Sequence, residues 1–82
     1  GTRGQVVAMM WRVLGAHEYE ADLSRFSDVD EIPGWSGARE AIEWAVDAGV
    51  MQGSDGQLNP NGIATRAEIA QLMMKFCESI KG

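Results

Sequence analysis

Cysteine, histidine and proline are scarce in this chain, with one cysteine, one histidine and two prolines among 82 residues. The single Cys77 excludes an internal disulfide and a zinc site built from cysteines. Cys77 lies in an apolar helical pattern, so we expect a buried, unreactive thiol. The alternative is a nucleophilic pair with His17, but no third orienting group or glycine-rich oxyanion turn accompanies it. The sequence therefore does not predict an enzyme, and it predicts no cofactor.

Long apolar runs and an excess of positive charge are also missing. No apolar stretch approaches the roughly 20 residues that cross a bilayer, so no membrane partner is predicted. The net charge of −5 disfavours nucleic acid as a partner, because nucleic-acid-binding domains carry a basic face. The hydrophobic content of 45% and charged content of 23% are those of a globular protein, and we expect one small domain.

The chain does contain an internal repeat, because residues 64–73 follow the pattern of residues 1–10 at a constant offset. In both copies a Thr precedes a Gln or Glu by three residues, ahead of an apolar run. This spacing is typical of a helix capping box. Repeats of this kind form arrays in which each unit is completed by its neighbours. The first copy lacks its front half, so we expect a fragment that begins within a repeat unit.

The apolar spacing predicts three helices, at about residues 3–14, 37–48 and 66–79. Ser36 is a weak candidate for the N-cap of the second helix, and Gly49 is the expected stop. The first and third helices are the more apolar, and we expect them in the interior. The sequence therefore predicts an all-α fold, a small helical bundle of repeat-derived helices with long connecting loops.

Two loops join the predicted helices. Residues 16–33 form a long surface loop, which we expect Phe26, Val29 and Ile32 to hold against the core. Residues 49–62 are rich in glycine and asparagine and predict tight turns. Within them, residues 50–51 and 57–58 are candidates for a short extended pair.

An acidic cluster, Asp28, Asp30 and Glu31, lies in the first loop. Carboxylate oxygens are calcium ligands, but the cluster lacks the further oxygen positions and the glycine of an EF-hand loop. Capping and solvation are the favoured interpretation.

Arg3 and Arg66 each follow a capping Thr in the first helical turn. Backbone N–H groups at a helix N-terminus bind anions, and a neighbouring arginine adds a fork that fits carboxylate or phosphate. The alternative is that each arginine pairs with an acidic neighbour such as Asp28 or Asp30. The spacing alone leaves both interpretations open.

The tryptophans allow two roles. Trp35 lies in a turn before the second helix, where its ring can fill the core or face a sugar or base. Trp11 and Trp44 lie within helical patterns and are expected in the core or in an interface.

A series of short segments follows one order along the chain, namely Phe26-Ser27-Asp28-Val29, Trp35, Ala41-Ile42-Glu43-Trp44-Ala45, Gly49-Val50-Met51-Gln52-Gly53, Asp55-Gly56, Pro60-Asn61 and Thr65-Arg66-Ala67-Glu68. In this order and spacing, these segments resemble the S-layer homology family. The resemblance divides the chain into one complete motif over residues 26–82, a linker at 16–25, and the C-terminal half of a preceding motif at 1–15. It also implies that three such motifs surround a pseudo-threefold axis.

The resemblance implies a secreted, non-catalytic module that anchors a protein to the bacterial cell wall or cell surface. Its implied partner is acidic, often pyruvylated, cell-wall polysaccharide. The binding residues that it implies are Arg66, Thr65, Trp35, Gly49 and Gly53, with Arg3 as part of a second site. The alternative is a structural or oligomerisation module with the same fold and no functional sugar site. The two differ over whether Arg66 is free for ligand or held in a salt bridge.

The sequence departs from the family pattern at several positions. Gly4 and Gln5 replace the usual Ala and Glu, and Leu58 replaces an aromatic residue. The isolated unit and a half is also expected to expose apolar surface that neighbouring motifs would cover, and to self-associate, most simply as a homodimer.

Overall fold

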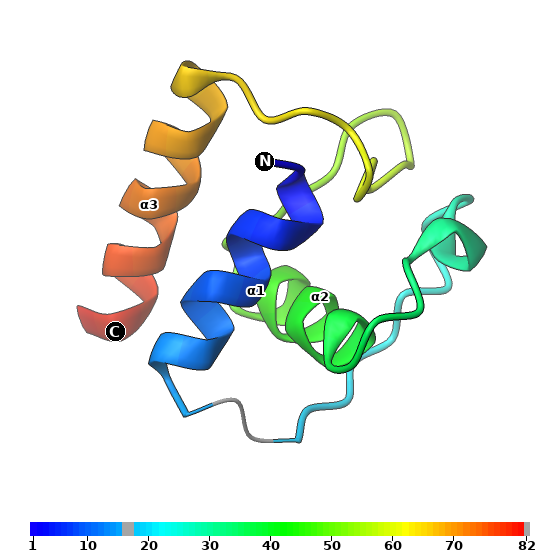
Figure 1. Cartoon of the computed structure of the whole chain (residues 1–82), viewed down its shortest axis with the longest axis horizontal. Helices are drawn as coiled ribbons and strands as arrows, with labels where there is room; N and C mark the ends of the chain where they lie inside the picture. Colours follow the sequence, from blue (N-terminus) through cyan, green and yellow to red (C-terminus); the bar gives the residue numbers. More distant parts are fainter. Residues whose placement is uncertain (16–17, 82) are drawn as a thin grey trace.

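The computed structural model describes residues 1–15 and 18–81. Over these residues the chain forms α1 (Arg3–Val13), a 3-10 turn at Val29–Glu31, α2 (Ala38–Asp47) and α3 (Arg66–Lys81) (Figure 1). Extended pairing in the described residues is limited to isolated bridges. The all-α prediction and the three helices are confirmed. His17 lies outside the described residues, and with it the pairing to Cys77.

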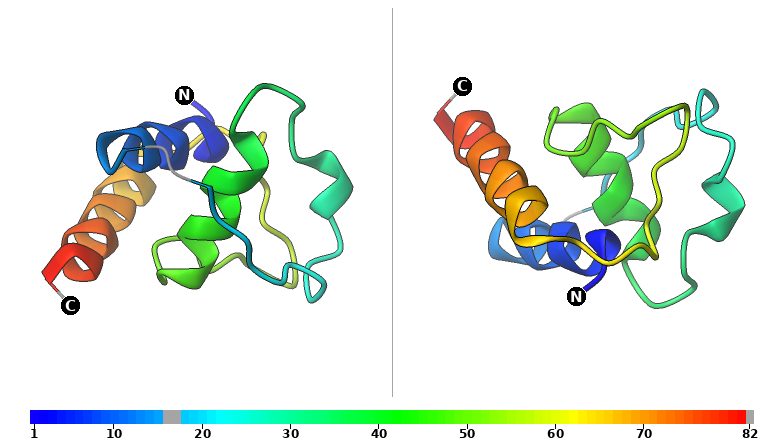
Figure 2. Two further views of the ribbon diagram at one scale, coloured as in Figure 1. Left: turned by 90° about the horizontal axis from the view of Figure 1, so that it is seen from below. Right: turned by 90° about the horizontal axis from the view of Figure 1, so that it is seen from above.

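The core is built around α2. Ala41, Ile42 and Ala45 on this helix are completely buried. From α1, Val7 and Trp11 pack into the same cluster. From α3, Phe76 meets Trp44 edge to face, with 5.9 Å between ring centroids. Figure 2 shows α3 splayed away from α2 along one side of the molecule.

The expected burial of α3 is wrong. No described side chain of α3 is fully buried. Met73, Met74 and Ile80 are 54%, 56% and 59% exposed, and Cys77 is exposed as well, which corrects the prediction of a buried thiol. The apolar surface of α3 extends around more of the helix than α2 and α1 can cover. Only the side that carries Leu72 and Phe76 packs against the core.

Both predicted capping boxes are present. The backbone N–H of Gln5 donates to Thr2 Oγ1 at 3.2 Å, and Thr2 N–H donates to Gln5 Oε1 at 3.0 Å. At α3, Glu68 N–H donates to Thr65 Oγ1 at 3.2 Å, and Thr65 N–H donates to Glu68 Oε1 at 3.1 Å. Each box satisfies two backbone donors that a helix N-terminus leaves open.

The start of α2 differs from the prediction, because its N-cap is Gly37 and not Ser36, with no side-chain cap. A Cβ at Gly37 would lie 2.7 Å from the Trp11 ring. The glycine therefore gives the indole room to pack between α1 and α2. The expected stop at Gly49 has positive φ, 79°, as a left-handed C-terminal residue should.

The loop after α2 is held by its backbone. The N–H groups of Val50 and Met51 both donate to Ala45 O, at 2.8 and 2.9 Å, and both side chains are buried. The expected extended pair is not formed. In its place, Ser54 and Gln57 bridge each other across a tight turn. Phe26 is buried, and Val29 and Ile32 pack on the core, so the loop before α2 is held as predicted.

Candidate functional site

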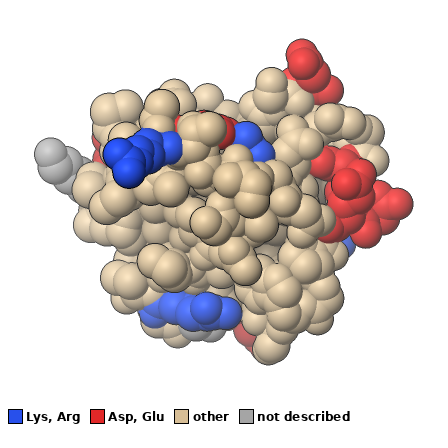
Figure 3. Space-filling view, turned by 45° about the horizontal axis from the view of Figure 1, so that its top comes forward, with Lys and Arg blue, Asp and Glu red and all other residues tan. Residues whose placement is uncertain are grey.

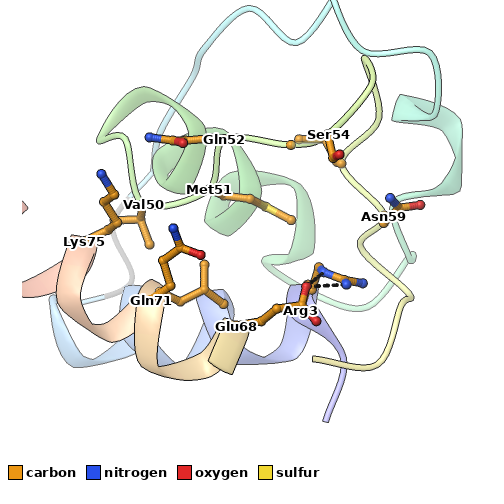
Figure 4. A pocket seen from close by; sticks show the side chains of 12 residues that line it. Arg3, Val50, Met51, Gln52, Ser54, Asn59, Glu68, Gln71 and Lys75 are labelled. Atoms are coloured by element: carbon orange, nitrogen blue, oxygen red, sulfur yellow. Dashed lines mark hydrogen bonds and ion pairs between the residues drawn. The ribbon is translucent and has the colours of Figure 1, made fainter. Parts of the chain in front are cut away.

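A cavity of about 470 Å³ lies between α3, the loop after α2 and the start of α1 (Figure 4). Its lining residues come from all three segments. They are Arg3, Val50, Met51, Gln52, Gly53, Ser54, Leu58, Asn59, Glu68, Gln71, Leu72 and Lys75.

The cavity combines an apolar base with a polar rim. Its buried lining residues, Val50, Met51 and Leu58, belong to the core. The exposed polar lining is dominated by side-chain amides and includes one hydroxyl, from Gln52, Ser54, Asn59 and Gln71. Amide groups both donate and accept hydrogen bonds, so such a rim suits a ligand with many hydroxyl groups.

Arg3 and Glu68 form an ion pair at one end of this cavity. Arg3 Nε donates to Glu68 Oε2 at 2.7 Å, and Nη2 donates to the same oxygen. The other carboxylate oxygen of Glu68 accepts from Thr65 N–H in the capping box. The pair therefore joins the first-turn arginine of one repeat copy to the capping glutamate of the next. It replaces the expected alternative of a bridge from Arg3 to Asp28 or Asp30.

The N-terminus of α1 is not open to an anion. Arg3 N–H donates to Gly62 O at 3.0 Å, and Gly4 N–H donates to Pro60 O at 2.9 Å. A Cβ at Gly4 would lie 3.0 Å from that same Pro60 oxygen. The glycine at this departure from the family pattern therefore permits a close approach of the loop to the helix.

The pKa of the Glu68 carboxyl is lowered, first by the hydrogen bond from the Thr65 backbone and then by the ion pair with Arg3. A carboxylate with a lowered pKa in the folded state stabilises the fold above its unfolded-state pKa, about 4.3 for Glu. We expect this stabilisation to be lost as the pH falls through the lower folded-state pKa. Melting temperatures of the wild type and Glu68→Gln between pH 7 and pH 3 should converge at the acidic end. A constant difference between them would contradict this assignment.

Lys75 lies at the other end of the cavity from Arg3 and Glu68 (Figure 4). It is on the same face of α3 as Glu68 and Gln71, and among the described residues it makes no ion pair. Neither Lys75 nor Gln71 was predicted as a site residue. The spacing of Glu68, Gln71 and Lys75 is i, i+3, i+7, which places all three on one helix face, and this spacing is the sequence signal that could have identified them.

The predicted site residues are not all brought together. Arg3 and Gly53 line the cavity, whereas Arg66, Thr65, Gly49 and Trp35 do not. Arg66 is exposed and makes no ion pair with any described residue.

Trp35 is half-buried and packs on the core cluster. The guanidinium of Arg12 lies over its ring, 5.7 Å from the centroid. Both observations give Trp35 a packing role in this structure.

In the acidic cluster, one carboxylate is buried and the other two are exposed. Asp28 is buried and accepts from Leu58 N–H at 2.8 Å and Asn59 N–H at 2.9 Å. Asp30 and Glu31 are exposed. In residues 1–15 and 18–81, no group of three His, Cys, Asp or Glu is arranged to hold a metal ion. The carboxylate of Asp28 instead positions the backbone at one side of the cavity.

Charge is unevenly distributed over the surface. Acidic side chains gather at one edge of the face shown in Figure 3, and most of the basic surface lies away from that edge. The cavity contains two basic residues and one acidic residue, in a chain whose net charge is −5. The cavity is therefore locally cationic within an acidic protein.

Comparison with known proteins is consistent with the motif order. Residues 25–70 match the model of the S-layer homology domain. The chain is 36% identical over 67 residues to the surface-layer 125 kDa protein of Lysinibacillus sphaericus, an alignment that covers 77% of this chain and 6% of that protein. None of the solved structures matches the chain. None of the described helices combines the length and apolar character needed to cross a membrane.

Proposed function

The chain belongs to the S-layer homology family, and from this premise we propose that it is a non-catalytic cell-wall-anchoring module on the bacterial surface. Its ligand is an acidic cell-wall polysaccharide, such as a pyruvylated one, bound in the cavity between α3 and the loop after α2. The observation that carries the proposal is the cavity itself, with its apolar base, amide rim and locally cationic lining.

The cavity chemistry supports a carbohydrate ligand. A sugar ring presents C–H groups on its faces and hydroxyl groups around its edge. Val50, Met51 and Leu72 offer apolar contact for the faces, and Gln52 and Gln71 offer hydrogen bonds for the hydroxyl groups. An excess positive charge then favours acidic sugars over neutral ones.

The position of the cavity also agrees with a repeat architecture. We propose that residues 1–15 are the C-terminal half of one motif, 16–25 a linker and 26–82 a complete motif. The cavity takes Arg3 from the first motif and the rest of its lining from the second. Each junction between consecutive motifs would then provide one binding site.

A second candidate function, a structural module that packs against neighbouring motifs, is favoured by the exposed face of α3. The buried face of α1 consists of Gly4, Val7, Ala8, Met10 and Trp11. The residues at the equivalent repeat positions of α3 are all exposed, namely Ala67, Ala70, Gln71, Met73 and Met74. A further motif could cover them as α2 and the loop after it pack on α1, and Arg66 would then pair with a carboxylate of that motif, as Arg3 pairs with Glu68.

Cosedimentation with purified bacterial cell walls tests the anchoring function. We expect the protein to sediment with intact walls and not with walls stripped of their non-peptidoglycan polysaccharide. Gln71→Glu adds a negative charge in the cavity without changing side-chain size, so it should weaken wall binding by at least about tenfold, or 1.4 kcal/mol. Gln57→Glu makes the same change on the exposed turn outside the cavity and should leave binding unchanged.

Two results would contradict the proposal in different ways. If the folded wild type does not sediment with intact walls, the structural module is the better account. If Gln71→Glu binds as well as Gln57→Glu, the protein is a wall anchor whose site lies outside this cavity.

A further inference from the structure

The three charged residues of the cavity are not equally available to a ligand. Arg3 directs both Nε and Nη2 to one oxygen of Glu68. Its remaining nitrogen, Nη1, lies against Gly62, where an added Cβ would be only 2.1 Å away. The edge of the guanidinium that would bind a carboxylate through two parallel hydrogen bonds is therefore occupied by the protein's own carboxylate.

Displacing Glu68 from Arg3 would not make room for an acidic group. Glu68 is also held by the Thr65 N–H in the capping box of α3, so its carboxylate is fixed at the cavity wall. An acidic ligand at Arg3 would meet this second negative charge at close range, which disfavours it. The Arg3–Glu68 end of the cavity suits neutral hydroxyl groups, which can donate to Glu68.

Lys75, unlike Arg3, is not neutralised by a carboxylate of the described residues. It makes no ion pair within the described residues, and it is partly exposed at the cavity wall. Glu68 precedes it by seven residues on α3, roughly 10 Å along the helix axis. Figure 4 shows the two ends well separated, with Gln71 between them. At physiological ionic strength, charges on an open surface at that separation are largely screened from each other.

We infer that Lys75 is the residue that selects for an acidic ligand, and that Arg3 instead joins the two repeat units through Glu68. The inference rests on the proposed function and assigns an orientation to the ligand. The carboxylate of the sugar lies at the Lys75 end, and its neutral hydroxyl groups lie along Gln71 towards the Arg3–Glu68 end. This differs from the role that the family resemblance gives to Arg66.

The test compares two forms of one purified cell-wall polysaccharide, the native form with its carboxylates and the same polymer with its carboxylates reduced to alcohols. We expect the wild type to bind the native form at least about tenfold more tightly than the reduced form. Lys75→Gln should bind both forms with the affinity that the wild type shows for the reduced form. Lys75→Arg keeps the charge and should restore the preference.

Arg66→Gln is the matched control, because it removes one positive charge outside the cavity. It should keep the preference for the native form, measured where circular dichroism shows the variant folded. If Lys75→Gln keeps the preference, or if Arg66→Gln abolishes it, the inference is overturned while wall binding stands. If the wild type binds both forms of the polysaccharide equally, the inferred selection of an acidic ligand is wrong, while binding to the polysaccharide stands. A wild type that binds neither form overturns the proposed function as well.

Discussion

Asp28→Ala is expected to lower the free energy of unfolding by about 3 kcal/mol or more. Asp28 is only 3% exposed, and its two oxygens accept from the backbone N–H groups of Leu58 and Asn59 at 2.8 and 2.9 Å. Removing the carboxylate leaves both donors without their partner, at roughly 1–3 kcal/mol each. Asn59 also has a positive φ of 50°, a conformation that needs support from its surroundings.

Urea unfolding followed by circular dichroism measures this effect, with two variants as controls. Asp30→Ala removes a neighbouring, exposed carboxylate and should change stability by less than about 0.5 kcal/mol. Asp28→Asn keeps the shape and one acceptor oxygen, so it should fall between the two. Equal midpoints for Asp28→Ala and Asp30→Ala would show that the two hydrogen bonds do not hold the loop.

Asp28→Ala should also change the shape of the cavity. Leu58 and Asn59 are part of its lining, so loss of the Asp28 hydrogen bonds releases one wall. We expect Asp28 to act on binding only through this wall, because it is buried and contributes no atom to the cavity surface.

The starts of α1 and α3 could be predicted from the sequence because capping is local. Thr2 with Gln5, and Thr65 with Glu68, are three residues apart, and each box formed as the spacing predicts. Gly49 ended α2 for the same reason, since a left-handed residue is required within one turn of the helix end.

The Arg3–Glu68 pair and the exposure of α3 could not be predicted in this way. Arg3 and Glu68 are 65 positions apart, and each was already explained locally, one as a first-turn arginine and the other as half of a capping box. Their contact depends on how the repeats pack. The pattern of α3 shows that it has apolar residues on several sides, but not which sides the rest of the chain can cover.

The candidate site was predicted only in part, because a family motif transfers residue types more reliably than positions in space. Gly53 lines the cavity, whereas Gly49 and Trp35 do not. The family resemblance places Trp35 near the ligand, but in this chain the indole packs beneath Arg12. Lys75 belongs to no quoted motif, and only the folded helix shows it beside the cavity.

Gly53→Ala is expected to be the second most damaging substitution, and Gly49→Ala is its matched comparison. Both glycines have positive φ, 76° and 79°, so an alanine at either position adopts a left-handed conformation at about 1 kcal/mol. They differ in their surroundings. A Cβ at Gly53 would lie 2.7 Å from the Phe26 ring and 2.8 Å from Gln57 O. A Cβ at Gly49 would have no described atom within 4 Å apart from those of its two chain neighbours.

The extra contact at Gly53 forces the buried Phe26 ring or the backbone of the turn to move, which adds about 1–3 kcal/mol of overpacking strain. We therefore expect urea unfolding to show a loss of about 3 kcal/mol for Gly53→Ala and about 1 kcal/mol for Gly49→Ala. Because Gly53 also lines the cavity, wall binding by the folded Gly53→Ala protein should fall, while that of Gly49→Ala should not. Equal losses of stability in the two variants would mean that only backbone conformation matters at these positions. Unchanged wall binding in folded Gly53→Ala would place the polysaccharide away from this turn.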